Sequence, residues 1–250
     1  MNAGKVTLIG AGPGDPELLT LKAARALGEA DVVLVDDLVN REVLRHAARA
    51  RIVEVGKRGG CKSTPQHFIN RMMIALAQQG QNVVRLKGGD AFLFGRGGEE
   101  MLALRAAGIE MEFVPGITSG TAVPATLGIP VTHREYTHGV TFVTGHTQDG
   151  TPVNWRALVE GGTTLVIYMG MKNLPEIVAG LLDAGMANEM PAAVIQQGTL
   201  PEQKQVITTL AALPMAARQA EMASPALIVV GDVVSLAQSA ALTDALKYAA

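Results

Sequence analysis

The sequence predicts an α/β protein of two α/β domains, each built on a mostly parallel sheet. Short runs of valine, leucine and isoleucine alternate with longer segments of helical periodicity along the 250 residues. Uninterrupted apolar runs of this kind are typical of strands that are buried on both faces. Aromatic residues make up only 4% of the chain, so the core is expected to consist mainly of aliphatic side chains.

The first half of the chain has the βαβ rhythm of a parallel sheet. In segment 65–79, Phe68, Ile69, Met72, Met73 and Leu76 recur at helical spacing and form one apolar stripe. Thr64 is the expected cap of that helix. The expected strands are 6–9, 32–35, 52–55, 83–86 and 111–114, and the expected helices are 18–28, 42–50, 65–79 and 98–107.

The pattern restarts in the second half. Segments 192–196 and 205–208 follow each other closely, which favours an antiparallel pairing between them. The expected strands are 140–143, 164–169, 192–196, 205–208 and 226–230, and the expected helices are 174–184 and 235–248. We therefore expect an N-terminal domain at 1–114 and a C-terminal domain at 115–250, with 128–139 as a connector.

Composition narrows the class of protein. The formal net charge is −2, whereas a nucleic-acid binder is usually basic, so no nucleic-acid partner is expected. The single cysteine, Cys61, excludes an internal disulfide and fits a reducing compartment. No spacing of histidine and cysteine suggests a metal site, and no apolar run of membrane-spanning length occurs, so neither a metal nor a membrane is expected. We expect a cytoplasmic protein.

The first glycine-rich turn, Gly10–Asp15, follows the first strand directly. It approximates the dinucleotide fingerprint GxGxxG, but Asp15 stands where the third glycine is required. A carboxylate there would repel a pyrophosphate. Asp15 followed by Pro16 instead predicts a helix cap and a first-turn proline. A purely structural turn is the alternative interpretation of this motif.

Other special residues also follow strands. Segment 85–100 contains two glycine clusters and two phenylalanines, which favours a ligand site over an ordinary loop with a hydrophobic plug. In segment 114–119 a strand gives way to hydroxyl residues, which alone are more often helix caps. Asp36 and Asp37 end the second strand, and Lys57 and Arg58 end the third. Because ligands bind at the carboxyl ends of parallel strands, we expect these groups to share one site.

These motifs together resemble the tetrapyrrole methyltransferase family. The matching runs occur in the same order along the whole chain, and they are closest in pattern to the members that methylate uroporphyrinogen III. The runs are 8–22, 84–98, 114–119, 128–134, 143–146, 168–170 and 224–231. The resemblance implies a homodimer of two-domain chains with the active site in the cleft between the domains. It implies transfer of methyl groups from S-adenosylmethionine to C2 and C7 of uroporphyrinogen III, giving precorrin-2.

The resemblance also assigns roles to matching residues. Asp36 and Lys57 match a proton acceptor and donor, and Arg96 and Glu99 are competing catalytic candidates that also face the tetrapyrrole, together with Arg134 and Met171. The residues that match contacts to S-adenosylmethionine are Pro13, Gly88, Gly89, Asp90, Leu93, Thr118, Ser119, Met169, Gly198 and Ala226. Ala91 and His67 depart from the family pattern, and Asp37 beside Asp36 is expected to raise the pKa of one of that pair.

This chemistry suits the residue types. A sulfonium methyl group is already activated, so the protein has to place a carbon nucleophile in line with it and needs no metal. The many carboxylates of the substrate need local cations, for which Arg58, Arg96 and Arg134 are the candidates. The alternatives are a related enzyme for a later corrin intermediate or a diphthine precursor, an NAD-dependent oxidoreductase, and a non-catalytic tetrapyrrole carrier.

Overall fold

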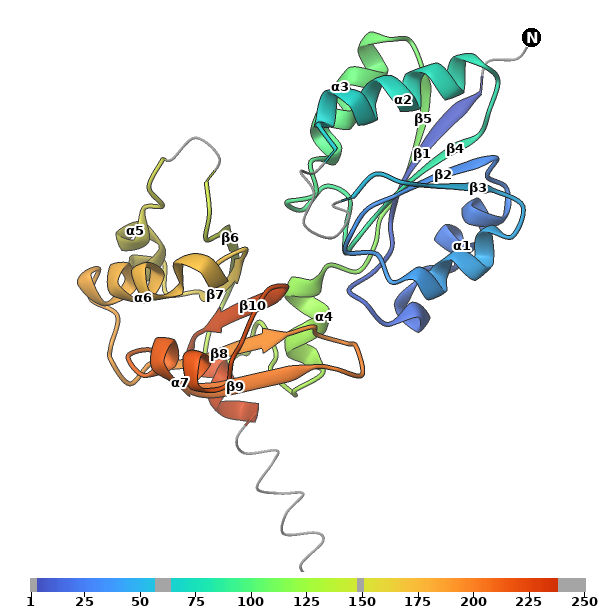
Figure 1. Cartoon of the computed structure of the whole chain (residues 1–250). Helices are drawn as coiled ribbons and strands as arrows, with labels where there is room; N and C mark the ends of the chain where they lie inside the picture. Colours follow the sequence, from blue (N-terminus) through green and yellow to red (C-terminus); the bar gives the residue numbers. More distant parts are fainter. Residues whose placement is uncertain (1–3, 57–63, 148–150, 238–250) are drawn as a thin grey trace, which may run out of the picture. The chain divides into compact units, whose positions relative to one another are not determined.

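The computed structural model describes residues 4–56, 64–147 and 151–237. The chain divides into two compact units, residues 1–118 and 119–250, and each has its own five-stranded sheet. In Figure 1 the colours run from blue at the N-terminus to red, so the order of the elements along the chain can be traced. Within the described residues, no helix is both long and apolar enough to span a membrane.

The sheet of the first unit is entirely parallel, with the strand order β3-β2-β4-β1-β5. Its strands are β1 (Lys5–Gly10), β2 (Val32–Val35), β3 (Arg51–Glu54), β4 (Val83–Lys87) and β5 (Glu110–Val114). Helices cover both faces (Figure 1). They are α1 (Leu21–Gly28), α2 (Gln66–Gln78) and α3 (Gly97–Ala106), with 3-10 segments at Pro16–Leu18 and Arg41–Ala47.

Alternating side chains of the first sheet supply two hydrophobic layers. Val33 and Val35 pack toward Leu27 of α1, whereas Val32 and Leu34 pack toward Met73 of α2. This alternation explains the continuous valine and leucine runs, because both faces of each strand are buried. The predicted helix at 42–50 is a 3-10 segment instead, and Thr64 does not cap α2, whose first turn follows Pro65 without a side-chain cap.

The sheet of the second unit is mixed, with the order β6-β7-β10-β8-β9. Its strands are β6 (Val140–Thr144), β7 (Thr164–Tyr168), β8 (Pro191–Gln196), β9 (Lys204–Thr209) and β10 (Ala226–Val230). Its helices are α4 (Ser119–Ala125), α5 (Trp155–Glu160), α6 (Leu174–Asp183) and α7 (Leu213–Gln219), with 3-10 segments at Met171–Asn173 and Asp232–Val234.

The α/β fold class is confirmed, but a mostly parallel sheet occurs only in the first unit. In the second, β6 and β7 are parallel, whereas β10 is antiparallel to both β7 and β8. The predicted antiparallel pairing of β8 with β9 is confirmed. The link between those two strands is too short for the crossover that a parallel pair requires. Most of the predicted helix 235–248 lies outside the described residues.

Candidate functional site

Glycines bring the ends of three neighbouring strands of the first unit into backbone contact. Gly12 and Gly89 exchange two backbone hydrogen bonds, with N···O distances of 3.1 and 2.7 Å. A Cβ atom on Gly10 would lie 2.5 Å from the carbonyl oxygen of Gly89 and 2.6 Å from the Cα of Gly116. No side chain fits at such a distance, so this edge of the sheet has to be bare backbone. Sequence reasoning placed Gly10 and Gly116 in motifs but did not select them.

The turn after β1 is held by polar side chains. Asp15 accepts a hydrogen bond from the backbone N–H of Glu17 at 2.8 Å and caps the 3-10 segment that starts at Pro16. The predicted cap at Asp15 is therefore confirmed. Asn40, which follows β2, donates from Nδ2 to the carbonyl oxygen of Gly14 at 2.9 Å. Pro13 lies in this turn and is half-buried.

The loop after β4 is organised by the Asp90 carboxylate. Its Oδ1 accepts hydrogen bonds from the backbone N–H groups of Phe92 and Leu93, at 2.8 and 3.1 Å. Its Oδ2 accepts from the N–H of Gly116 at 3.2 Å, which ties the loop to the end of β5. The carboxylate therefore shapes the loop and fixes its position against the end of β5. Gly88 is close to Leu38, since a Cβ on it would lie 3.0 Å from the Leu38 Cβ.

Four charged side chains form a cluster beside these glycines, here called the strand-end charge cluster: Asp36, Arg85, Lys87 and Glu100. Arg85 and Lys87, both on β4, are 1% and 3% exposed, and Glu100 on α3 is fully buried. The Oδ2 of Asp36 lies 3.1 Å from Arg85 Nη2 and 3.6 Å from Lys87 Nζ. The Oε1 of Glu100 lies 2.9 Å from Arg85 Nε and 3.4 Å from Lys87 Nζ.

The strand-end charge cluster keeps Asp36 ionised. Burial raises the pKa of Asp36, but the charges of Arg85 and Lys87 and the N–H of Asp37 outweigh it, so that this pKa lies below its ordinary value of 3.8. The expectation that an aspartate pair would raise a pKa therefore does not hold for Asp36. Burial and the Arg85 charge lower the pKa of Lys87, and the two carboxylates only partly oppose them.

Arg96 and Glu99 pair with each other at the start of α3. Two hydrogen bonds join them, Nε to Oε1 at 2.8 Å and Nη2 to Oε2 at 2.7 Å. Arg96 has a left-handed backbone with φ 61° and stands at the N-cap of α3. Its hydrogen bond lowers the pKa of Glu99. Both side chains are about half exposed, so they are available to a ligand from solvent.

The predicted residues of the second unit lie in the loops that follow its strands and in neighbouring segments. Met169 follows β7, has φ 55° and is 52% exposed. The preceding Tyr168 accepts a hydrogen bond at its hydroxyl from the backbone N–H of Gly120, at 2.7 Å, directly after Ser119. Gly198 follows β8, and a Cβ on it would overlap with the side chain of Val123, a residue of α4. The end of β7 and the loop after β8 therefore both lie close to α4.

The remaining candidates differ in their surroundings. Thr118 is half-buried and precedes α4, and Ala226 begins β10 opposite Gln196 of β8. Arg134 is exposed beside an open hollow of about 580 Å³, which His133 and His138 also line. Met171 is partly buried against the hydrophobic core of its unit. Lys57 and Arg58 lie outside the described residues.

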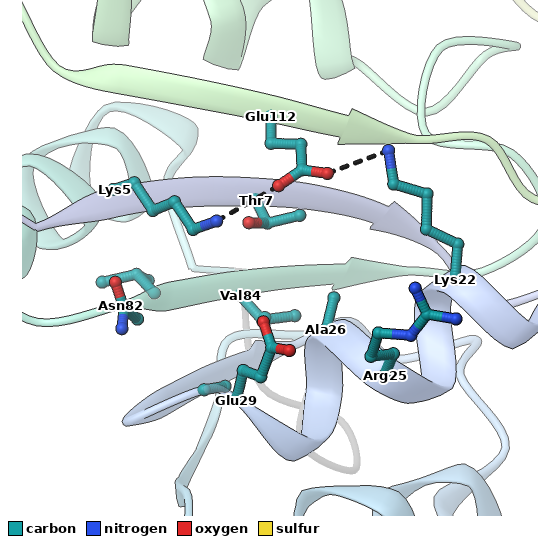
Figure 2. A pocket seen from close by; sticks show the side chains of 11 residues that line it. Lys5, Thr7, Lys22, Arg25, Ala26, Glu29, Asn82, Val84 and Glu112 are labelled. Atoms are coloured by element: carbon teal, nitrogen blue, oxygen red, sulfur yellow. Dashed lines mark hydrogen bonds and ion pairs between the residues drawn. The ribbon is translucent and has the colours of Figure 1, made fainter.

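A separate cavity of about 140 Å³ lies at the opposite, amino-terminal ends of β1 and β4 (Figure 2). Glu112 of β5 bridges two lysines there, at 3.2 Å from Lys5 and 2.9 Å from Lys22. Hydrogen bonds from Lys22 and Lys5 lower the pKa of Glu112. The cavity shares no residue with the glycine-rich strand ends, so we place it outside the candidate site.

The fold is that of a known class of enzyme. Residues 5–214 match the family described as Tetrapyrrole (Corrin/Porphyrin) Methylases, and the chain belongs to that family. It is 56% identical over 231 residues to the Uroporphyrinogen-III C-methyltransferase of Pseudomonas aeruginosa, covering 92% of this chain and 94% of that one. It is 49% identical over 236 residues to the Siroheme synthase of Methylococcus capsulatus, covering 93% of this chain and 50% of that one.

A solved structure of an enzyme is also similar to this chain. The uroporphyrin-III C-methyl transferase of Thermus thermophilus, complexed with S-adenyl homocysteine, is 40% identical with a TM-score of 0.80. The alignment covers 93% of this chain and 100% of that one. Within the described residues, no group of three or more histidine, cysteine, aspartate or glutamate side chains is arranged to hold a metal ion.

Proposed function

We propose that this chain transfers methyl groups from S-adenosylmethionine to C2 and C7 of uroporphyrinogen III, giving precorrin-2. Similarity to two relatives supports this proposal: the Pseudomonas aeruginosa enzyme and the Thermus thermophilus enzyme with its bound demethylated donor. Precorrin-2 is the branch point for sirohaem, cobalamin and haem d1, and the Siroheme synthase similarity supports use in the first of these.

The glycine-rich ends of β1, β4 and β5 are the observation that carries the proposal. Gly10, Gly89 and Gly116 let the backbone of three neighbouring strand ends meet without side chains between them, and glycine-rich backbone at the carboxyl ends of parallel strands is typical of nucleotide-like ligand sites. The residues present therefore fit S-adenosylmethionine. Those proposed to hold it are Pro13, Gly88, Gly89, Asp90, Leu93, Thr118, Ser119, Met169, Gly198 and Ala226.

When bound, S-adenosylmethionine supplies a methyl group already activated by the positive sulfur. The protein has to orient the ring carbon, exclude water and take up the proton that the methylated ring releases. Asp36 is proposed as the proton acceptor, because the cations of β4 keep it ionised. Its low pKa suffices, since a methylated ring that bears positive charge is a strong acid.

The substrate is proposed to bind through its carboxylates. Arg96 and Arg134 are exposed and offer bidentate hydrogen bonds to them, with Glu99 orienting Arg96 through the pair at its guanidinium. Arg58 and Met171 are proposed to complete the contacts, and Lys57 to donate a proton.

The direct test is anaerobic incubation of the full chain with uroporphyrinogen III and methyl-labelled S-adenosylmethionine. The expected product contains two labelled methyl groups, located at C2 and C7 by ¹³C NMR. A parallel reaction with a later corrin intermediate serves as the comparison. Labelling of that compound alone would overturn the proposed substrate, and labelling of neither would overturn the activity.

The family resemblance also supports a cytoplasmic homodimer. Light scattering of the purified chain tests the assembly, and a mass of one chain at micromolar concentration would contradict it. Fractionation of the source cells tests the location, with the chain expected in the cytoplasmic fraction.

A further inference from the structure

We propose that Glu100 and Lys87 are positioning residues for Asp36, and that together with Arg85 they fix both the place and the charge of its carboxylate. This inference rests on the proposed function, in which Asp36 accepts a proton. It adds three residues of the strand-end charge cluster that sequence reasoning did not select.

The geometry makes Asp36 the outer end of a buried network. Arg85 and Lys87 stand two residues apart on β4, so their side chains emerge on the same face of the sheet. Both cations approach one oxygen of Asp36, Oδ2, and both approach one oxygen of Glu100, Oε1. Asp36 is partly exposed, whereas the three others are almost fully enclosed.

Glu100 is held in place from a second direction. Gln66 of α2 donates from Nε2 to Glu100 Oε1 at 3.0 Å and also to Asn70 Oδ1 at 3.1 Å. The other oxygen, Oε2, is buried and has no hydrogen-bond partner among the described residues. An unsatisfied buried carboxylate oxygen is unfavourable, and buried ion pairs in general are weak sources of stability. A role toward Asp36 accounts for keeping these charges at a strand end.

The other charged groups near Asp36 do not replace the cluster. Asp37 donates its backbone N–H to Asp36 Oδ1 at 3.1 Å. Arg41 donates to the backbone carbonyl of Asp36 at 2.9 Å, but its second Nη pairs with Glu54 at 2.6 Å. The carboxylate oxygen that faces the interior is therefore contacted by Arg85 and Lys87 alone among the described residues.

The two positioning residues have opposite charges, so their removal is expected to shift the Asp36 pKa in opposite directions. Lys87→Met removes a cation from Asp36, so the Asp36 pKa is expected to rise. Glu100→Gln preserves the shape and the Arg85 contact but removes the anion that shares both cations, so the Asp36 pKa is expected to fall. A role confined to stability would leave the acid limb of kcat/KM unchanged, because that limb follows the Asp36 pKa only if Asp36 acts in turnover.

The experiment is a ¹³C-carboxyl NMR titration of the full chain labelled at aspartate, with the Asp36 resonance identified by Asp36→Asn. Lys87→Arg is the rescue variant and is expected to keep the Asp36 pKa low. Lys22→Met, which removes a lysine from the Glu112 pair at the other end of the strands, is the matched control. The acid limb of kcat/KM is expected to shift in the same directions, so that Lys87→Met is roughly tenfold less active on the acidic side.

Opposite shifts in Lys87→Met and Glu100→Gln support the inference. Shifts in the same direction, or none, overturn it. If Lys87→Met does not fold, Glu100→Gln decides alone, since a fall in the Asp36 pKa supports the inference and any other result overturns it. Normal turnover of Asp36→Asn would instead contradict the catalytic role of Asp36, and the titration would be unaffected by that outcome.

Discussion

The Asp90 carboxylate accepts a hydrogen bond from the backbone N–H of Gly116 at 3.2 Å, which connects the loop after β4 to the end of β5. Its other oxygen accepts two further N–H groups of its own loop. One side chain thus holds the backbone of two strand ends in the arrangement that is proposed to receive the methyl donor.

Replacing Asp90 is expected to loosen that backbone. Asp90→Ala removes three acceptor contacts, so we expect a loss of about 1–3 kcal/mol of unfolding free energy and weaker binding of S-adenosylhomocysteine. Urea unfolding and calorimetry measure the two effects. The control is Asn154→Ala, which removes the cap of α5 in the second unit and should cost about 1 kcal/mol without changing affinity. Unchanged affinity in Asp90→Ala would contradict the proposed role of the loop.

Gly10 and Gly98 are expected to respond differently to an added methyl group. Gly10→Ala forces a Cβ against the backbone of Gly89 and Gly116, so we expect a loss of about 1–3 kcal/mol and of donor binding. A Cβ on Gly98 of α3 meets nothing within 4 Å, so Gly98→Ala should be neutral or stabilising by up to about 1 kcal/mol. Thermal denaturation compares the pair, and equal effects would refute the packing argument.

Removing the Arg96 side chain is expected to weaken substrate binding while the fold survives. Because the side chain is half exposed and its partner Glu99 is also exposed, Arg96→Ala should change unfolding free energy by less than about 1 kcal/mol. The KM for uroporphyrinogen III should rise roughly tenfold or more. Arg96→Gly should lose the same affinity in a more stable protein, because glycine tolerates the φ of 61°.

The control for Arg96 is Arg105→Ala. Arg105 is an exposed arginine on the same helix, 4.0 Å from the sulfur of Met101. Steady-state kinetics should show an unchanged KM for this variant. A KM for Arg96→Ala as low as that of Arg105→Ala would remove Arg96 from the substrate site.

The low pKa of Asp36 predicts a defined pH dependence of stability. A group whose pKa is depressed by folding stabilises the protein above its unfolded pKa and loses that contribution as pH falls through the folded value. The difference in unfolding free energy between the wild type and Asp36→Asn should therefore be constant from neutral pH down to about pH 5. It should shrink below the ordinary value of 3.8. A difference that persists undiminished down to the acid unfolding limit would contradict the ion pairs.

Strand positions could be predicted closely because the runs are short, apolar and bounded by glycine or charge. The expected strands 32–35 and 226–230 coincide with β2 and β10. Short helices could not be predicted in this way. α4, α5 and α7 have six or seven residues each, too few for an apolar stripe to repeat. Strand order in the second sheet depends on long-range pairing that local patterns do not contain.

The glycine-rich strand ends could be predicted, because glycines cluster in the sequence directly after the predicted strands. The strand-end charge cluster was missed, although Arg85 gave a signal, since a cation in the middle of a buried and mainly apolar strand needs a partner. Its partner Glu100 lies fifteen residues further along on α3, and only the packing of α3 on the sheet brings them together. The structural use of the Asp90 carboxylate likewise depends on contacts that the sequence does not display.

Calorimetry with S-adenosylhomocysteine, followed by co-crystallisation, tests whether the glycine-rich strand ends bind the methyl donor. We expect one binding site per chain, with the ligand against the backbone of residues 88–93 and the glycines at the end of β1. Well-folded protein that binds neither this compound nor S-adenosylmethionine, or a ligand located away from those strand ends, would contradict it.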